Sequence, residues 1–220
     1  MDSMELMRAR HSVRRYLDRP IEAEKLAALR QAVEEVNREG GLHVQLFAEE
    51  PEAFAANAPH YGMFKGCRNY FAMVGPKDAD EQIGRFGERL VLRAQELGLN
   101  TCWVALTFRK SKVAVDTARG EKLHVVIALG YGENQGVPHK SRAAAAVSNL
   151  TDSSPDWFRR GVEAAMLAPT AVNQQKFFFE QDGRLVRART KLCFYGRMDL
   201  GIAKYHFELG AGRENFDWAY

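Results

Sequence analysis

The stretch from Arg10 to Tyr16, RHSVRRY, places two guanidinium groups and a hydroxyl group at alternate positions. Residues i, i+2 and i+4 project to one face of an extended chain, and residues i and i+4 are also neighbours on a helix. Arg10 and Arg14 therefore share a face in either conformation. The planar fork of arginine fits a phosphate or carboxylate, and Ser12 supplies a shorter donor between two such forks. The segment predicts an anion site, with a solvated basic turn as the alternative.

A second basic group, HKSR, contains His139, Lys140 and Arg142 and follows the segment GYGENQG. A dinucleotide fingerprint needs a third glycine that opens a helix. In this chain the third glycine comes one residue late and Pro138 follows it, so no helix begins there. We interpret the segment as a close-approach loop that brings the basic group near whatever lies over the sheet. An exposed basic loop is the alternative.

The stretch APTAVNQQ, residues 168–175, combines a helix stop with amide side chains. Pro169 stops the preceding helix, and Thr170 or Asn173 can tighten the turn by bonding to the backbone. Asn173 and Gln175 carry amides that both donate and accept, which suits the polar edge of a heterocycle. The alternative is an ordinary turn after a helix.

Composition excludes several other kinds of chemistry. The chain has no G-x-S-x-G elbow, no H-E-x-x-H motif and no C-x-x-C pair, and Cys67, Cys102 and Cys193 are widely spaced. We therefore expect free thiols in a reducing compartment and no zinc site. The net charge of +3 is too small for a nucleic-acid footprint, and no segment is long and uncharged enough to span a bilayer. These features predict a cytoplasmic protein that binds neither nucleic acid nor membrane.

Apolar spacings of three and four, together with terminal glycines, predict helices along much of the chain, and alternating or continuous apolar runs predict strands. The alternation of the two predicts an α/β or α+β fold around a central sheet. The expected helices are 2–10, 21–40, 78–98, 111–118, 156–167 and 199–212. The expected strands are 43–47, 69–75, 100–106, 124–130, 176–181, 184–190 and 214–220.

Two segments, 83–104 and 200–219, each run from a helix through a glycine into a strand that contains a tryptophan, Trp103 or Trp218. This echo suggests a duplicated half-domain, although any α/β protein repeats helix and strand. We place the boundary in the long polar connection, which gives halves at 1–147 and 148–220. An irregular stretch, 49–65, is a candidate lid or a plain surface loop.

Taken together, these stretches resemble the nitroreductase family of FMN-dependent oxidoreductases. RHSVRRY resembles the R-x-S-x-R phosphate motif of that family, and HKSR is similar to basic residues that return to the phosphate. ELGLNTCWVAL is similar to the G-L-G-T-C-W-I segment behind the flavin, and VVIALGYG to the I-A-I-G-Y strand end. APTAVNQQKFFF resembles A-P-S-x-x-N-x-Q-P-W-x-F, which contacts the flavin from the partner subunit.

The resemblance implies an α+β nitroreductase-like FMN-binding fold, with a central, mostly antiparallel sheet flanked by helices. It implies FMN as cofactor, NADH or NADPH as electron donor, and a small acceptor such as a nitroaromatic, a quinone or an enone. The chemistry would occur at flavin N5, with no catalytic side chain. The cofactor-binding residues carried over from the motifs are Arg10, His11, Ser12, Arg14, Val104, Ala105, Leu106, His139, Lys140, Arg142, Pro169, Thr170, Asn173 and Gln175.

The order of the motifs departs from the ordinary family, because the A-P-S-like motif stands at 168–175 instead of following the first long helix. We infer two related halves fused in one chain, as in a shorter, rearranged branch of the family, and either a monomer or a homodimer. Two other functions remain open on the sequence: a flavin-binding or flavin-delivery protein without efficient turnover, and a basic protein that binds nucleic acid through RHSVRR and HKSR.

Overall fold

The computed structural model describes residues 2–54 and 64–219 of the chain, so most of the candidate lid lies outside the described residues. Contacts divide the chain into two compact units. We call them the four-stranded unit and the three-stranded unit, after the sheet in each. The four-stranded unit comprises Arg10–Ala79 and Arg89–Val137, and the three-stranded unit comprises Met1–Ala9, Asp80–Glu88 and Pro138–Tyr220.

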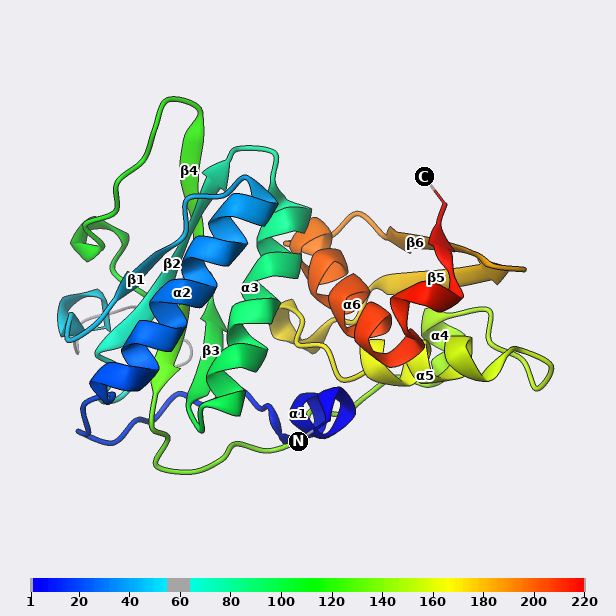
Figure 1. The fold of residues 1–220 in the computed structure, drawn as a ribbon, viewed down its shortest axis with the longest axis horizontal. Helices are drawn as coiled ribbons and strands as arrows, with labels where there is room; N and C mark the ends of the chain where they lie inside the picture. The colour runs from blue at the N-terminus through cyan, green and yellow to red at the C-terminus, as the bar shows by residue number, and fades with distance from the viewer. Residues whose placement is uncertain (1, 55–63, 220) are drawn as a thin grey trace. The chain divides into compact units, whose positions relative to one another are not determined.

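The four-stranded unit contains an antiparallel sheet with strand order β1-β2-β4-β3, with helix α2 beside it (Figure 1). Strands β2 and β4 are central and mostly buried, which explains their continuous apolar runs at 70–74 and 125–129. Helix α2 ends at Gly41, whose φ of 59° is the left-handed conformation that a glycine cap supplies. The elements are α2 (Ala23–Gly40), β1 (Gln45–Phe47), β2 (Asn69–Pro76), β3 (Asn100–Val104), β4 (Glu121–Gly130) and the later part of α3 (Asp80–Glu96).

The three-stranded unit contains an antiparallel hairpin, β5 and β6, and a short strand β7 that pairs parallel to β6. Helices α5 and α6 pack so closely that a Cβ atom on Gly210 would lie 2.5 Å from the Cβ of Ala164. The core is aromatic, and the rings of Phe179 and Phe207 stack with centroids 4.7 Å apart. The elements are α1 (Ser3–Ala9), α4 (Ala144–Val147), α5 (Asp156–Ala165), β5 (Phe177–Asp182), β6 (Leu185–Thr190), α6 (Gly196–Ala211), β7 (Asp217–Trp218) and the first part of α3. Across both units, short 3₁₀ turns occur at Pro51–Phe54, Lys110–Lys112, Ala171–Asn173 and Arg213–Asn215.

The predicted α+β class with a mostly antiparallel sheet is confirmed, as are the long helices and the hairpin. The helix expected at 111–118 is wrong, because only a 3₁₀ turn forms at its start. Val113 and Val115 are β-branched, and the Gln45 amide bonds both to the N–H and to the carbonyl of Asp116. Helix α4 was not predicted, and the first and last strands are shorter than expected. The related halves 1–147 and 148–220 are a different division from the two units and stay a prediction.

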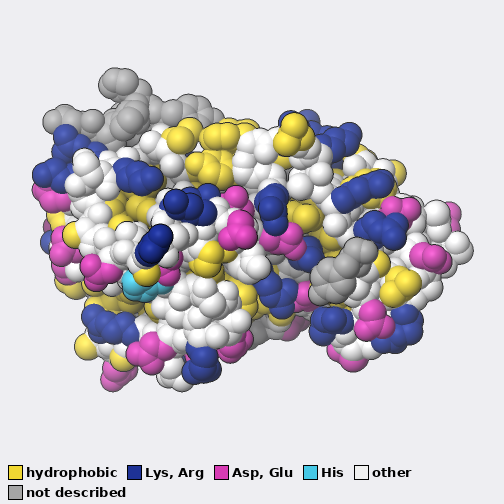
Figure 2. All heavy atoms as spheres, turned by 90° about the horizontal axis from the view of Figure 1, so that it is seen from above, with side chains coloured by type: hydrophobic (Ala, Val, Ile, Leu, Met, Phe, Trp, Pro, Cys, Tyr) yellow, Lys and Arg dark blue, Asp and Glu magenta, His cyan; other side chains and the backbone are white. Residues whose placement is uncertain are grey.

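None of the helices formed by the described residues is long and apolar enough to cross a membrane. On the face seen in Figure 2, Lys and Arg side chains are interspersed with Asp and Glu side chains. The described residues hold no group of three or more potential metal ligands. Cys67, Cys102 and Cys193 are free thiols in the structure.

Candidate functional site

In the four-stranded unit, the RHSVRRY segment runs alongside strand β3. Ser12 forms a parallel bridge with Thr101, and the Val13 N–H donates to the Thr101 carbonyl oxygen at 3.0 Å. The side chain of Val13 is buried, and the Tyr16 hydroxyl donates to the Val13 carbonyl oxygen at 2.7 Å. Val13 therefore fixes this segment to β3 through its buried side chain and its backbone hydrogen bonds.

Arg10, Ser12 and Arg14 all act on the same buried thiol, that of Cys102 in β3. Burial raises the pKa of Cys102, while the charge of Arg14, a hydrogen bond with Ser12 and the charge of Arg10 oppose that rise. The three side chains are therefore near enough to Cys102 to influence its thiol, and their role as an anion site stays a prediction. Arg10 is buried and Arg14 is exposed, and no acidic side chain among the described residues pairs with Arg14.

The loop after β4 packs against the same segment. The Nδ1 atom of His11 lies 3.2 Å from the Gln135 carbonyl oxygen. Gly136 has a φ of 72°, and a Cβ atom there would lie 2.6 Å from the His11 Cβ. The glycines of GYGENQG thus permit a close approach to residues 10–16, which agrees with the close-approach interpretation of this loop.

The three residues expected behind the flavin ring lie at the end of β3. Val104 is buried and ends the strand, Ala105 is half-buried, and Leu106 is 64% exposed. Seven of the predicted site residues are thus in the four-stranded unit: Arg10, His11, Ser12, Arg14, Val104, Ala105 and Leu106.

The other predicted site residues lie in the three-stranded unit, where two loops are bonded together. The Nε2 atom of His139 donates to the Met166 carbonyl oxygen at 2.9 Å. Asn173 and Gln175 each donate a side-chain N–H to the Lys140 carbonyl oxygen, both at 2.9 Å. The structure therefore brings HKSR and APTAVNQQ into direct contact, although about thirty residues separate them along the chain.

Gln175 is the centre of this contact, with only 2% of its surface exposed. Its Oε1 atom accepts from the Arg142 N–H at 2.9 Å, and its Nε2 atom also donates to Asn173 Oδ1 at 2.7 Å. The Gln175 N–H donates to the Thr170 hydroxyl oxygen at 3.1 Å. The Gln175 amide is thus engaged by the chain itself, and it orders the loop that follows Pro169.

This loop has an unusual backbone. Val172, Asn173 and Gln175 adopt positive φ angles of 46°, 55° and 45°. Asparagine tolerates this conformation, but a β-branched valine pays a steric penalty, so surrounding contacts must impose it. Strained backbone of this kind is concentrated at functional sites, which favours a binding role for the loop.

Asp199, in the first turn of α6, holds the loop and was missed by reasoning from the sequence. Its carboxylate accepts from the Ala171 N–H at 3.0 Å and from the Gln174 amide at 2.7 Å. The side chain is buried, and burial raises the pKa of Asp199 to about 6 against the opposing effect of these hydrogen bonds. The available signal was a lone acidic residue within the apolar run Met198–Ile202.

A family model and several solved structures are similar to this chain. The family described as "Putative TM nitroreductase" matches residues 2–211. A solved structure described as a "putative nitroreductase" from Thermotoga maritima is 22% identical, with a TM-score of 0.66 over 97% of this chain and 85% of that chain. No curated protein matches the sequence.

Other solved structures share the fold over a smaller part of this chain. One from Desulfovibrio desulfuricans, described as a "putative nitroreductase in complex with FMN", is 17% identical with a TM-score of 0.55, covering 70% of this chain and 99% of that chain. One from Parabacteroides distasonis, described as "Putative NADH dehydrogenase/NAD(P)H nitroreductase", is 20% identical with a TM-score of 0.52, covering 69% and 97%. At these identities the likeness shows the fold alone, and the family match shows that the chain belongs to the "Putative TM nitroreductase" family.

Proposed function

We propose that the chain is an FMN-dependent oxidoreductase that takes electrons from NADH or NADPH and passes them to a small organic acceptor such as a nitroaromatic or a quinone. The observation that carries the proposal is the position of Ser12 beside Thr101 of β3, with Arg10 and Arg14 both near enough to influence the Cys102 thiol. The family match and the shared fold with an FMN complex from Desulfovibrio desulfuricans support the same cofactor.

The donors beside β3 fit a flavin phosphate. Two guanidinium groups and a hydroxyl group suit a phosphate dianion, and no carboxylate belongs to this set. Because Arg14 is exposed and has no acidic partner among the described residues, its charge is available to a ligand. Arg10, His11, Ser12 and Arg14 would hold the phosphate, and Lys140 and Arg142 would add positive charge.

The remaining motif residues would contact the flavin ring. Val104, Ala105 and Leu106 offer backbone groups and apolar surface at the end of β3. Pro169, Thr170, Asn173 and Gln175 belong to the loop that Asp199 orders. When bound, FMN supplies the hydride chemistry at its N5 atom. The chain's own residues bind and orient the cofactor, and none is required as a nucleophile.

The test is the visible absorption spectrum of the purified protein, with the released chromophore identified. We expect a yellow protein that contains FMN, and we expect the colour to bleach when NADH or NADPH is added without oxygen. Reoxidation by an added quinone would then establish turnover. A protein that holds FMN but is not reduced by either nucleotide would be a flavin carrier, and a colourless protein that takes up no FMN would refute the proposal.

Compartment and assembly are further parts of the proposal. The free thiols of Cys67, Cys102 and Cys193 support a reducing compartment, the cytoplasm. The fused halves would supply in one chain the contacts that two subunits share in ordinary members, so the particle would be a monomer or a homodimer. Sedimentation of the flavin-loaded protein distinguishes these two states.

A further inference from the structure

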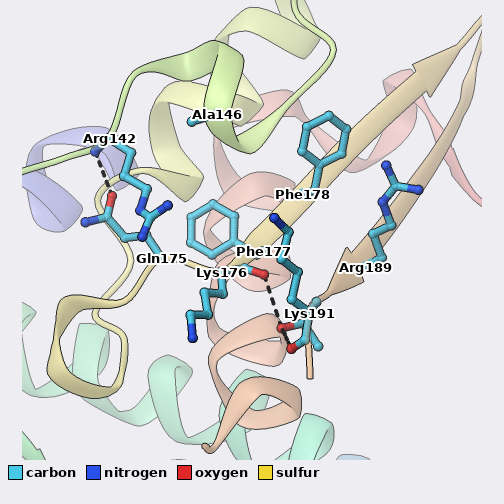
Figure 3. Close-up of a pocket in the computed structure, with 9 residues that line it drawn as sticks. Arg142, Ala146, Gln175, Lys176, Phe177, Phe178, Arg189 and Lys191 are labelled. Atoms are coloured by element: carbon cyan, nitrogen blue, oxygen red, sulfur yellow. Dashed lines mark hydrogen bonds between the residues drawn. The ribbon is translucent and has the colours of Figure 1, made fainter. Parts of the chain in front are cut away.

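A pocket of about 390 Å³ lies wholly within the three-stranded unit, at the beginning of β5 and the end of β6 (Figure 3). A volume of this size is typical of sites for small molecules. The residues that line it are Arg142, Ala146, Gln175, Lys176, Phe177, Phe178, Arg189, Thr190 and Lys191.

The charged residues that line this pocket are all positive. Four of its nine lining residues are cationic and none is acidic. Arg142, Lys176 and Lys191 form no ion pair with any described residue. Arg189 has only a long contact, 3.8 Å, with the exposed carboxylate of Glu180. Uncompensated positive charge around a hollow attracts an anion.

The same pocket has one accessible aromatic ring, that of Phe178, since Phe177 faces the core and packs against Phe179. Phe177 is buried and Phe178 is half-buried, and the Arg189 guanidinium lies 4.9 Å from the centre of the Phe178 ring. In Figure 3 the Lys191 side chain extends towards these two rings, whereas Lys176 points away from them. A flat apolar body can therefore lie against the Phe178 ring while its anionic group meets Lys191 and Arg189.

We propose that this pocket binds a small aromatic anion, with a flat ring against Phe178 and a carboxylate or similar group between Lys191 and Arg189. The two residues that also belong to the FMN set, Arg142 and Gln175, lie on the far side of Phe177 from Lys191 in Figure 3. We place the anion at the Lys191 end of the pocket, so we expect FMN and the anion to bind together.

The test is titration calorimetry of the full chain with 2-naphthoate, performed with and without saturating FMN. We expect saturable binding in both conditions and much weaker binding of neutral 2-naphthol. Inorganic phosphate, which lacks the ring, should also bind more weakly than naphthoate. Replacing one exposed cation, in Lys191→Gln or Arg189→Gln, should weaken naphthoate about two- to fivefold, and the double variant about tenfold. Arg187→Gln is the matched control, because Arg187 is an exposed arginine of β6 that does not line the pocket.

The titrations with the variants and with the neutral analogue distinguish the proposed site from its alternatives. Loss of affinity in the Lys191 and Arg189 variants, with Arg187→Gln unchanged, supports the proposal. Equal binding of naphthol and naphthoate, no binding, or equal loss in the control overturns it. Competition between FMN and naphthoate also overturns it, because the pocket would then belong to the cofactor site. Naphthoate binding in a chain that takes up no FMN would refute the proposed function and leave this site intact.

Discussion

His206 of α6 and Glu88 of α3 form a fully buried pair in the three-stranded unit, with His206 Nε2 lying 2.9 Å from Glu88 Oε1. The other ring nitrogen, Nδ1, lies 3.1 Å from the Ala164 carbonyl oxygen and must donate to it. Both ring nitrogens of His206 are therefore engaged, one by the Glu88 carboxyl group and the other by a backbone carbonyl.

Glu88→Ala should destabilise the protein by about 3–5 kcal/mol, because it leaves a buried ring nitrogen without its partner. Glu88→Gln keeps a hydrogen-bonding group of the same shape and should cost about 1–2 kcal/mol. Urea unfolding of the two variants measures the difference. Equal losses would show that packing volume, and not the hydrogen bond to His206, accounts for the stability at this site.

Asp199 should give the protein a pH dependence of stability that an asparagine removes. The pKa of Asp199 in the folded state is about 6, above its ordinary value of 3.8, so between these values the folded state binds more protons than the unfolded state. Stability from this group is therefore fully present below pH 4 and is lost as the pH rises to 6, by roughly 3 kcal/mol in total.

Urea unfolding of the wild type and Asp199→Asn between pH 4 and pH 7 tests this effect. Other carboxylates contribute equally to both proteins, so the difference between the two free energies isolates Asp199. A difference that stays constant across this pH range would contradict the assignment. Limited proteolysis of residues 169–175 would report separately whether the loop loosens in the variant.

Arg14→Gln should weaken FMN binding about ten- to a hundredfold, because a charge-assisted hydrogen bond contributes roughly 1.5–3 kcal/mol. Riboflavin, which lacks the phosphate, should bind the variant and the wild type alike. Arg15→Gln is the control, since the Arg15 guanidinium is bonded to Glu133 at 2.8 Å. The role of Arg14 at the phosphate fails if riboflavin and FMN lose affinity equally.

Gly136→Ala should disturb the RHSVRRY segment, because a Cβ atom at residue 136 would lie 2.6 Å from the His11 Cβ. Gly183→Ala is matched to it, since Gly183 also has a positive φ, 59°, but no neighbouring atom within 4 Å. The control should lose about 1–2 kcal/mol from backbone strain alone. Gly136→Ala should lose more and should also weaken FMN, as thermal unfolding and flavin titration would show. Similar losses in both variants would argue against the close contact.

Local signals were sufficient for the regular elements. Helix α2 was predicted from its apolar spacing and its glycine stop, and Gly41 indeed adopts a left-handed conformation. The hairpin of β5 and β6 was predicted from Asp182 and Gly183, and it forms around them. These elements could be predicted because their determinants lie within a few residues of one another. The segment 111–118 fails for the opposite reason, because Gln45, far away in the sequence, binds the backbone of Asp116.

The sequence by itself determined the long helices, most of the strands, the motifs and their order, because periodicity and turn chemistry are local properties. Only the tertiary structure decided that Arg10, Ser12 and Arg14 all influence the Cys102 thiol, and that Gln175 bonds to Lys140 and to Arg142. It alone showed that Asp199 holds the strained loop. The physical reason is that burial and hydrogen-bond partners arise from segments distant in the chain, so they change the roles of side chains without leaving a local pattern.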